Sequence, residues 1–522
     1  MKRPKLSHRG GQIAAFSGLR LFAALSPRPE AQPEGLGPKA SARGGWQASH
    51  PLVGYLEKRD VNDRLQQFAS SFIQSTRDYI FVRPEDNLLI LRPNRVHHLN
   101  ATATVMLKAL YDRQALDVEA IVAELAERYG VPPERIEEDM EKLLQSLSLL
   151  LQDKAGCAPA VKTTPFGSHE RKYPVLSEIA LTYRCQNRCF FCYASSPDRG
   201  RQVAEMTTDE VKLVLDKIVN QAKVPTVSFT GGEPTLRDDL PELVAHAKGL
   251  GMRVNLISNG IKCADASYVA TLAEAGLDSA QISLEAGEAA VHDAVVAHPG
   301  AFERTVQGVR NLRAAGIHTH TNTTINQKNQ QALPALIDSL AEMDMEYLSM
   351  NMVIRTGGAV GVPDINYQAI GDLVLSLKAR AEERGMRFVW YSPVPYCLFN
   401  PAQHGLGSQS CSAADGLLSV APDGAVLPCS SFEEGIGNLL SEDFATLWNR
   451  RTARYWRDKE FLPPGCQECE LAHICCGACP LYWDEQGTFA EIAPYMAKTS
   501  IWDRLTWSLK RRYLGQVKGV GM

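Results

Sequence analysis

The chain has 522 residues, a formal net charge of −4 and 45% hydrophobic residues. Domains typically have roughly 100–200 residues, so this length predicts two to four of them. The near-neutral charge gives no support for nucleic-acid binding, and no run of about 18 consecutive apolar residues predicts a transmembrane helix.

The first 50 residues differ from the rest, with eight Lys or Arg against two Asp or Glu and many Gly, Pro and Ala. This composition cannot bury a core. The apolar run near Ile13–Leu25 suggests a signal peptide, but Arg20 interrupts it and no clean cleavage site follows. We expect residues 1–75 to be mostly a disordered basic tail and linker, or the product of an over-extended start.

Residues 76–152 are expected to form a small independent domain. Short β-like runs at Tyr79–Arg83, Leu88–Arg92 and Val96–Leu99 are separated by Pro and Asn. Three helical patterns follow, at 101–111, 118–129 and from Pro132 to about Leu150. Residues 153–172 are expected to be a linker.

From about residue 173 to 395, strand and helix patterns alternate. The candidate strands are Leu176–Thr182, Thr226–Thr230, Arg253–Ser258, Ser279–Ser283, His318–Thr324 and Tyr347–Val353. Thr207 and Glu210 form a capping-box pattern at the start of one intervening helix. Six β/α units predict an α/β fold with a parallel sheet, open or curled into a partial (β/α)6 barrel, whose chemistry sits at the carboxyl ends of the strands.

A cysteine triplet, Cys185, Cys189 and Cys192, directly follows the first of these strands. Three thiolates can hold three irons of a 4Fe–4S cube, which normally takes four Cys. The fourth iron is then open to the amine and carboxylate of an amino acid, such as the methionine part of S-adenosylmethionine (SAM). The alternative is a zinc knuckle, but zinc usually takes four ligands and no fourth is close in the sequence.

The stretch from Tyr183 to Tyr193, with Phe191 before the third Cys, resembles the signature of the radical SAM superfamily. Gly231, Gly232, Glu233 and Pro234, at the end of the second strand, resemble its glycine-rich motif, and Ser258 with Asn259 resembles the next family element. Glycines let the backbone approach a ligand closely. The resemblance implies that these residues contact SAM. Ser283, Asn322 and Thr324, at the ends of later strands, are candidate contacts to its ribose or carboxylate; the alternative is that they are ordinary strand-end polar residues.

This resemblance also implies a mechanism. The Cys185, Cys189 and Cys192 cluster gives one electron to SAM, which breaks into methionine and a 5′-deoxyadenosyl radical. That radical abstracts a hydrogen atom from the substrate, while the protein orients the substrate and excludes water.

Residues 396–485 contain a second set of cysteines. Cys411, Gly424 and Cys429 are followed by Cys466-x2-Cys469-x5-Cys475-x3-Cys479, and the set resembles the SPASM extension of peptide-modifying radical SAM enzymes. One or two structural zinc sites are the alternative. Residues 486–522 are expected to be a C-terminal extension.

The SPASM resemblance implies two auxiliary 4Fe–4S clusters. Cys411, Cys429 and Cys479 would hold one, with Cys397 as a possible fourth ligand, and Cys466, Cys469 and Cys475 would hold the other. The usual final Cys beyond Cys479 is absent. Cys476, Asp484 or an open iron would then complete the second cluster, and its presence is open. Cys157 and Cys263 fit no spacing and are expected to be ordinary thiols.

The motifs at 87–93, 96–100 and 134–147 resemble the PqqD-like peptide chaperone of pyrroloquinoline quinone biosynthesis, a winged-helix fold that recognises leader peptides. Its expected mode is addition of an extended peptide to a sheet edge. A DNA-binding winged helix is the alternative, but the acidic residues of 76–152 argue against it.

These features together predict a cytoplasmic radical SAM enzyme that modifies a side chain of a ribosomally made precursor peptide. A small redox protein of the flavodoxin or ferredoxin type is the expected electron donor, and neither nucleic acid nor membrane is an expected partner. The alternatives are an enzyme of small-molecule cofactor biosynthesis, of the PQQ or haem type, and a non-catalytic electron-transfer protein. The intact triplet and glycine motif argue against the last.

Overall fold

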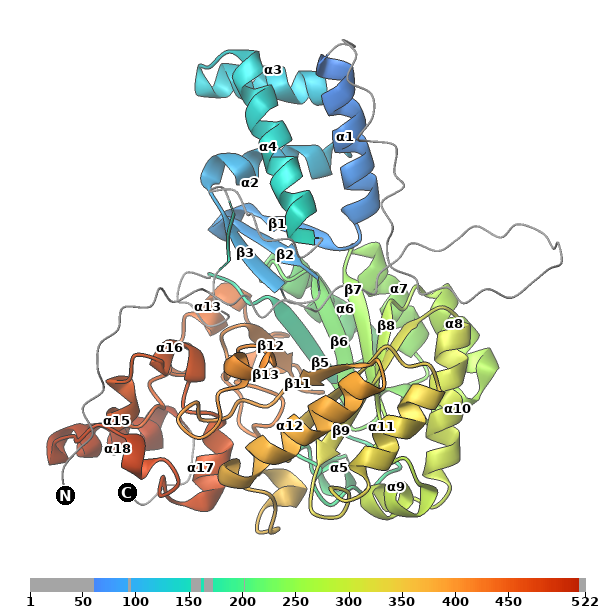
Figure 1. Cartoon of the computed structure of the whole chain (residues 1–522), viewed down its shortest axis with the longest axis vertical. Coiled ribbons are helices and arrows are strands. Elements are labelled where there is room, and N and C mark those ends of the chain that lie inside the picture. The colour runs from blue at the N-terminus through green and yellow to red at the C-terminus, as the bar shows by residue number, and fades with distance from the viewer. Residues whose placement is uncertain (1–60, 93–94, 152–160, 164–171, 201, 516–522) are drawn as a thin grey trace. The chain divides into compact units, whose positions relative to one another are not determined.

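The structure, a computed structural model, describes residues 61–92, 95–151, 161–163, 172–200 and 202–515. The expected tail up to position 60 and Cys157 lie outside the described residues. The chain divides near residue 164 into two compact units (Figure 1).

The N-terminal unit combines an antiparallel sheet, in the order β1-β2-β3-β4, with a set of helices. The strands and helices expected between residues 79 and 150 are present, and their bounds lie within a few residues of those predicted. Its elements are α1 (Val61–Thr76), β1 (Ile80–Arg83), β2 (Leu88–Leu91), β3 (Arg95–Leu99), α2 (Ala101–Asp112), α3 (Val118–Tyr129), α4 (Pro133–Leu151) and β4 (Val161–Thr163). Local signals fix the helix ends: the Asn100 side chain caps α2 at 2.7 Å, and Gly130 ends α3 with a φ of 64°.

Helix α1 is an integral part of this unit, which corrects the expectation of a disordered linker up to residue 75. Leu65, Ala69, Phe72 and Ile73 are at most 6% exposed and join the core of the unit. They follow one another at the spacing of one helical face. Polar residues between these positions made the apolar stripe hard to recognise in the sequence, and the segment follows a long basic tail.

The outer strand of the small sheet comes from the segment that was expected to be only a linker. β4 pairs antiparallel with β3, so that His97 faces Thr163, His98 faces Lys162 and Leu99 faces Val161. The β3 edge is therefore occupied over these three residues by the chain itself.

The second unit contains a ten-stranded sheet. Its first seven strands are parallel and are joined mostly by helices. The strands are β5 (Leu176–Thr182), β6 (Thr226–Gly231), β7 (Arg253–Ser258), β8 (Ser279–Ser283), β9 (His318–Ile325), β10 (Tyr347–Met352) and β11 (Arg387–Trp390). The helices are α5 (Ser196–Arg199), α6 (Thr208–Asn220), α7 (Leu240–Gly249), α8 (Ala266–Glu274), α9 (Ala289–Val296), α10 (Ala301–Ala314), α11 (Leu333–Glu342) and α12 (Tyr367–Glu383).

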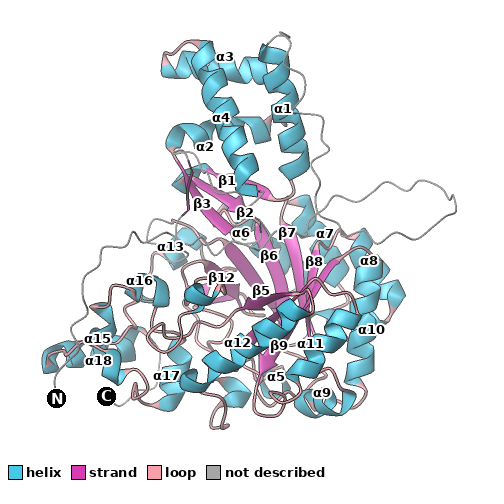
Figure 2. Cartoon of the chain, viewed as in Figure 1, coloured by secondary structure: helices cyan, strands magenta, loops and turns pink. Residues whose placement is uncertain are grey.

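The parallel strands lie in sequence order from β5 to β11, and the sheet is not closed into a barrel. This confirms the expected α/β architecture and adds β11, which the sequence pattern did not delimit. Figure 2 shows α8, α10, α11 and α12 along the outside of the strands. The capping box of Thr207 and Glu210 is present at the start of α6.

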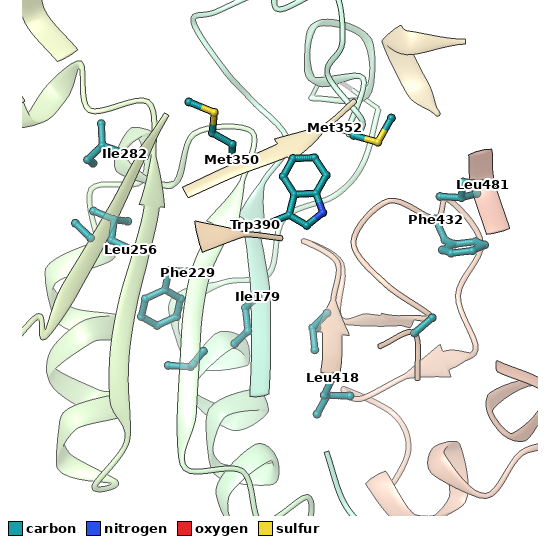
Figure 3. Packing of buried hydrophobic residues seen from close by; sticks show 14 of the residues in the cluster. Ile179, Phe229, Leu256, Ile282, Met350, Met352, Trp390, Leu418, Phe432 and Leu481 are labelled. Carbon is teal, nitrogen blue, oxygen red and sulfur yellow. The ribbon is translucent and has the colours of Figure 1, made fainter. Parts of the chain in front are cut away.

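Large apolar side chains from successive strands form the core of this unit. Figure 3 shows Ile179, Phe229, Leu256 and Ile282 from β5 to β8, each at most 1% exposed. Burial of one such side chain contributes about 1.5–3 kcal/mol. This layer fixes the register of the strands. Because the strands run parallel, all their carboxyl ends lie at one edge.

The C-terminal segment extends the same sheet. β12 pairs with β5 in parallel, and an antiparallel β12-β13-β14 meander completes the sheet order. The segment contains β12 (Leu417–Val420), β13 (Ala425–Leu427), β14 (Gly437–Asn438), α13 (Phe444–Trp448), α14 (Arg451–Arg457), α15 (Pro464–Gln467), α16 (Ala472–Cys475), α17 (Pro480–Gln486) and α18 (Ile501–Leu514).

Within the described ranges, no helix has both the length and the apolar character needed to cross a membrane.

The role of α1 predicts which fragments fold. A fragment of residues 61–163 should unfold cooperatively in urea, monitored by circular dichroism. A fragment of residues 76–152 should not, because it lacks Leu65, Phe72 and Ile73, each contributing about 1.5–3 kcal/mol to a stability of about 5–15 kcal/mol. A fragment of residues 61–152 separates the contribution of β4. Equal urea midpoints for 61–163 and 76–152 would contradict this account of the core.

Candidate active site

The cysteine triplet lies on the loop that leaves β5, at the edge where the parallel strands end. The backbone N–H of Arg184 donates to the Thr182 hydroxyl at 2.9 Å, and the N–H of Cys192 donates to the Cys189 carbonyl at 3.1 Å. Arg184 also forms an ion pair with Glu205 at 2.8 Å. These contacts hold the loop in a tight turn. Cys185, Cys189 and Cys192, which are four and three positions apart, therefore lie on the same side of the loop.

Burial and neighbouring groups of the triplet raise the pKa values of Cys185 and Cys189. Burial raises the pKa of the Cys185 thiol to about 12, and Glu233 and Cys192 contribute to the rise. Burial also raises the pKa of Cys189, together with Glu285 and the other two thiols. The Asn259 amide lies 3.9 Å from the Cys185 sulfur as a donor. Three clustered thiols with an amide donor suit a metal–sulfur group, because binding to a metal removes the thiol protons.

The glycine motif allows two backbone segments to touch. A Cβ atom at Gly231 would lie 2.1 Å from the Thr182 carbonyl oxygen, and one at Gly232 would lie 2.4 Å from the Arg184 carbonyl oxygen. Gly231 also has a φ of 136°, which side chains strongly disfavour. The turn after β6 can therefore lie directly against the cysteine loop only because these residues are glycines.

Glu233 has no exposed surface and connects the loops after β6 and β7. Its carboxylate accepts hydrogen bonds from the Ser258 hydroxyl and the Asn259 N–H, both at 2.8 Å. The N–H and hydroxyl of Thr235 donate to it at 3.1 and 2.6 Å. Burial raises the pKa of Glu233, and these donors offset part of the rise. The hydrogen bonds of the Glu233 carboxylate are thus all made to neighbouring protein groups. The glycine-rich motif alone did not indicate this structural role.

The remaining expected SAM contacts lie at the same edge. The Ser258 hydroxyl donates to Glu233 and accepts a hydrogen bond from the Gly260 N–H at 2.9 Å. Asn322 accepts from the Ser349 hydroxyl at 2.9 Å, and Ser283 pairs with it across β8 and β9. The side chains of three expected SAM contacts are half-buried at this edge: Phe191, Ser283 and Asn322.

Glu285 is a site residue that the sequence analysis missed. It is 3% exposed, two residues beyond the end of β8, and accepts from the Thr324 N–H at 2.9 Å. Burial raises its pKa to about 8, and it acts electrostatically on Cys189. The signal was present in the sequence, since a lone carboxylate directly follows a buried strand.

The cysteines of the C-terminal segment fall into two sets. In the first, burial raises the pKa of Cys479 to about 12 with Cys411 contributing, and Cys411 and Cys479 both act on Cys429. The Ala414 N–H donates to the Pro428 carbonyl at 2.8 Å, which joins the loops of Cys411 and Cys429. This brings together the three cysteines that were expected to share a cluster.

The second set contains Cys466, Cys469 and Cys475, and Cys397 lies with it. Burial raises the pKa of the Cys397 thiol to about 11, with contributions from Cys475 and Cys469. The Tyr396 N–H donates to the Cys475 sulfur at 3.3 Å. The turn after β11 thus lies against Cys475, whereas the sequence analysis offered Cys397 to the set of Cys411; the ligand set of Cys397 stays a prediction.

Asp484, one of the expected candidates for the second set, is paired with a cation. Its carboxylate forms an ion pair with Arg511 of α18, and both side chains are nearly buried. In the described part of the chain, no three His, Cys, Asp or Glu side chains converge closely enough to hold a single metal ion. A 4Fe–4S cube takes its thiolates at separate corners, so its ligands do not need to meet at one point.

Comparison with known families agrees with this geometry. Residues 179–340 match the radical SAM superfamily, residues 87–148 match coenzyme PQQ synthesis protein D, and residues 411–470 match the iron–sulfur cluster-binding SPASM domain. The chain thus carries these three domains, with the PqqD-type domain first and the SPASM domain last, as the sequence analysis expected.

Individual relatives are more distant. The chain is similar to an AdoMet-dependent heme synthase of Methanosarcina barkeri, at 26% identity over 62% of this chain and 96% of that protein. It is also similar to a PqqA peptide cyclase of Rhodopseudomonas palustris, at 29% identity over 59% and 82%. Streptococcus suis SuiB, solved bound to its precursor peptide SuiA, has a similar fold with a TM-score of 0.57. The match has 15% identity and covers 78% of this chain and 95% of SuiB.

The protein is therefore a radical SAM enzyme whose cofactors are 4Fe–4S clusters and SAM. The cysteine loop, the glycine turn and the buried carboxylates fit that chemistry, because they gather thiolates and polar groups at one edge of a parallel sheet.

The contact between the glycine turn and the cysteine loop can be tested by one methyl group. Replacing Gly232 with Ala should displace the Arg184 carbonyl and lower the iron content of the anaerobically reconstituted protein by about four per chain, the content of one cube. Gly249→Ala is the matched control, because nothing lies within 4 Å of a Cβ at that helical position. Unchanged iron in Gly232→Ala would show that this close approach does not support the cluster.

Proposed function

We propose that this enzyme modifies a side chain of a ribosomally made precursor peptide. The observation that carries the proposal is that a PqqD-type domain, a radical SAM domain and an SPASM domain occur in one chain. The PqqD-type unit has its own core and its own sheet. Such a unit carries none of the clustered cysteines, so we infer that it recognises a substrate that is larger than the reacting group.

In this proposal Cys185, Cys189 and Cys192 hold the cluster that binds SAM. When bound, the cluster and SAM supply a 5′-deoxyadenosyl radical that abstracts a hydrogen atom from the substrate. The glycine turn at Gly231 and Gly232 offers backbone groups to SAM at close range. The role of Glu233 is to position the turn, and Asn259 orients the cluster through the Cys185 sulfur.

The half-buried residues at the strand ends complete the proposed SAM site. Phe191 would pack against the cofactor, and Ser283 and Asn322 would meet its polar groups. Pro234 follows the turn and begins a short 3-10 helix, which fixes the exit of the chain. Glu285 lies beyond β8 next to Cys189, where a carboxylate can accept a hydrogen bond from SAM or substrate.

The cysteines of the SPASM domain would hold auxiliary clusters, with Cys411, Cys429 and Cys479 in one and Cys466, Cys469 and Cys475 in the other. A small redox protein of the flavodoxin or ferredoxin type would supply electrons. Exposed thiols and clusters of this kind require a reducing compartment such as the cytoplasm.

A small-molecule substrate is the competing proposal, and the similarity to a heme synthase over 62% of this chain favours it. A haem-type substrate would be bound entirely by the barrel and would not need the PqqD-type unit. The two proposals differ in one measurable property: only a peptide maturase loses affinity for its substrate when the N-terminal unit is altered.

Peptide binding by the N-terminal unit would use a sheet edge, where backbone groups supply affinity and side-chain pockets supply selectivity. At β3, the edge is partly occupied by β4, which pairs with His97 to Leu99. A leader peptide that adds to β3 must therefore displace this strand or extend beside it. The intramolecular strand would then act as a competitor for the peptide.

The assignment of the triplet predicts the behaviour of a variant. Replacing Cys185, Cys189 and Cys192 together with Ala should abolish formation of 5′-deoxyadenosine from SAM under a strong reductant, measured by chromatography. Iron should fall by about four per chain, while the auxiliary clusters remain. Replacing the buried Cys263 with Ala is the control and should preserve both properties. If the triple variant still forms 5′-deoxyadenosine, the assignment of the triplet is wrong.

The competition at β3 predicts a gain of affinity. Replacing Val161, Lys162 and Thr163 with Pro removes the backbone donors of β4 and should tighten binding of a peptide encoded next to the gene about tenfold, or about 1.4 kcal/mol, measured by calorimetry on the full chain. Lys162→Val keeps the strand and should leave the affinity unchanged. Weaker binding in the Pro variant would mean that β4 supports the peptide instead of competing with it.

A further inference from the structure

The second set of SPASM cysteines lacks one ligand in the sequence. Cys466, Cys469 and Cys475 provide three thiols, and no cysteine follows Cys479. A 4Fe–4S cube normally takes four Cys. Three side chains are candidates for the missing ligand, and they differ in what they already contact: Asp484, Cys476 and Cys397.

Asp484 already has a cationic partner. Its ion pair with Arg511 is nearly buried, with side-chain exposures of 11% and 5%. Removing one partner of such a pair leaves an uncompensated buried charge, which is strongly destabilising. A cluster that recruited Asp484 would leave Arg511 in that state.

Cys476 follows Cys475 directly but belongs to other surroundings. It is fully buried, with a φ of 51°, at the end of α16. The charged and thiol groups that act on it most strongly are Lys459 and Cys411, ahead of Cys475. Its thiol donates to the His473 carbonyl at 3.9 Å, so it is already engaged within its own helical turn.

Cys397 has the opposite environment. The turn Pro395–Phe399 is fixed by N–H groups of Leu398 and Phe399, which donate to the Pro395 carbonyl at 2.9 and 3.0 Å. Tyr396 and Phe399 in this turn are each 7% exposed, whereas Cys397 between them is exposed. Cysteine is among the residues most often buried. Cys397 is exposed although the aromatic side chains on either side of it are buried. Its sulfur is therefore available to bind a metal.

The same turn is attached to the second set. The Tyr396 N–H donates to the Cys475 sulfur at 3.3 Å, one residue before Cys397. The N–H of Cys469 donates to the Cys466 carbonyl at 3.0 Å, so a single helical turn presents both of these thiols on one side. Cys469 and Cys475 act electrostatically on Cys397, and Cys397 acts on Cys466.

We propose that Cys397 is the fourth protein ligand of the cluster held by Cys466, Cys469 and Cys475, in place of the cysteine missing beyond Cys479. This assignment rests on the proposed auxiliary clusters. The ligand then comes from the turn after β11, the last parallel strand, so the cluster joins the barrel to the helical part of the SPASM domain. Cys397 and Cys469 are exposed, which places this cluster at the surface, accessible to an electron donor.

The test uses the full chain in which Cys185, Cys189 and Cys192 are already Ala, so that iron reports only on the auxiliary clusters. This background should hold about eight irons, from two cubes. Adding Cys397→Ala should remove about four of them, or one, with a 3Fe–4S signal appearing in the electron paramagnetic resonance spectrum. Adding Cys263→Ala instead should preserve both iron and spectrum, because Cys263 is buried in the core and belongs to neither set.

Two outcomes would overturn the assignment: an unchanged spectrum and iron content in the Cys397 variant, or the same loss of iron in the Cys263 variant. Circular dichroism of each variant shows that the fold is retained. Formation of 5′-deoxyadenosine by the chain with an intact triplet is measured separately. Failure of that reaction would count against the proposed function, and retention of iron in Cys397→Ala would count against this ligand.

Discussion

One buried carboxylate organises the edge of the sheet on which the chemistry depends. Glu233 has no exposed surface and accepts four hydrogen bonds from Ser258, Asn259 and Thr235. Leaving one buried donor unsatisfied costs about 1–3 kcal/mol, so these bonds fix the two loops to each other. Asn259, held in this way, donates to the sulfur of Cys185. The position of the cluster-binding loop thus depends on a residue that does not need to touch the cluster.

A second buried carboxylate links the parallel sheet to the SPASM domain. Glu178 on β5 accepts from the Ser419 hydroxyl of β12 at 2.5 Å and from the Ser430 N–H at 3.3 Å. Burial raises its pKa, and these donors offset part of the rise. Because β12 also pairs with β5, the two domains share one sheet. The segment that carries the auxiliary cysteines is therefore joined directly to the strand that leads into the triplet.

The sequence predicted those features that depend on local periodicity and spacing. The bounds of β5, β7 and β8 agree with the expected strands, because alternating strands and helices are encoded residue by residue. The cysteine triplet was identified for the same reason: its ligands lie within eight residues of one another. Helix α1 was missed because its apolar stripe is short and interrupted, and β4 because three residues carry no usable pattern.

What the sequence by itself determined is therefore the class of enzyme: three domains, their order, and the cysteines available to clusters. Only the tertiary structure decided how those cysteines are grouped. Cys397 lies 69 residues before Cys466 in the sequence, yet the turn after β11 brings it beside Cys475 of that set, while Lys459 and Cys411 act more strongly than Cys475 on adjacent Cys476. The reason is physical: ligation depends on distances between side chains, and packing of distant segments sets those distances, whereas sequence spacing reports only on neighbours along the chain.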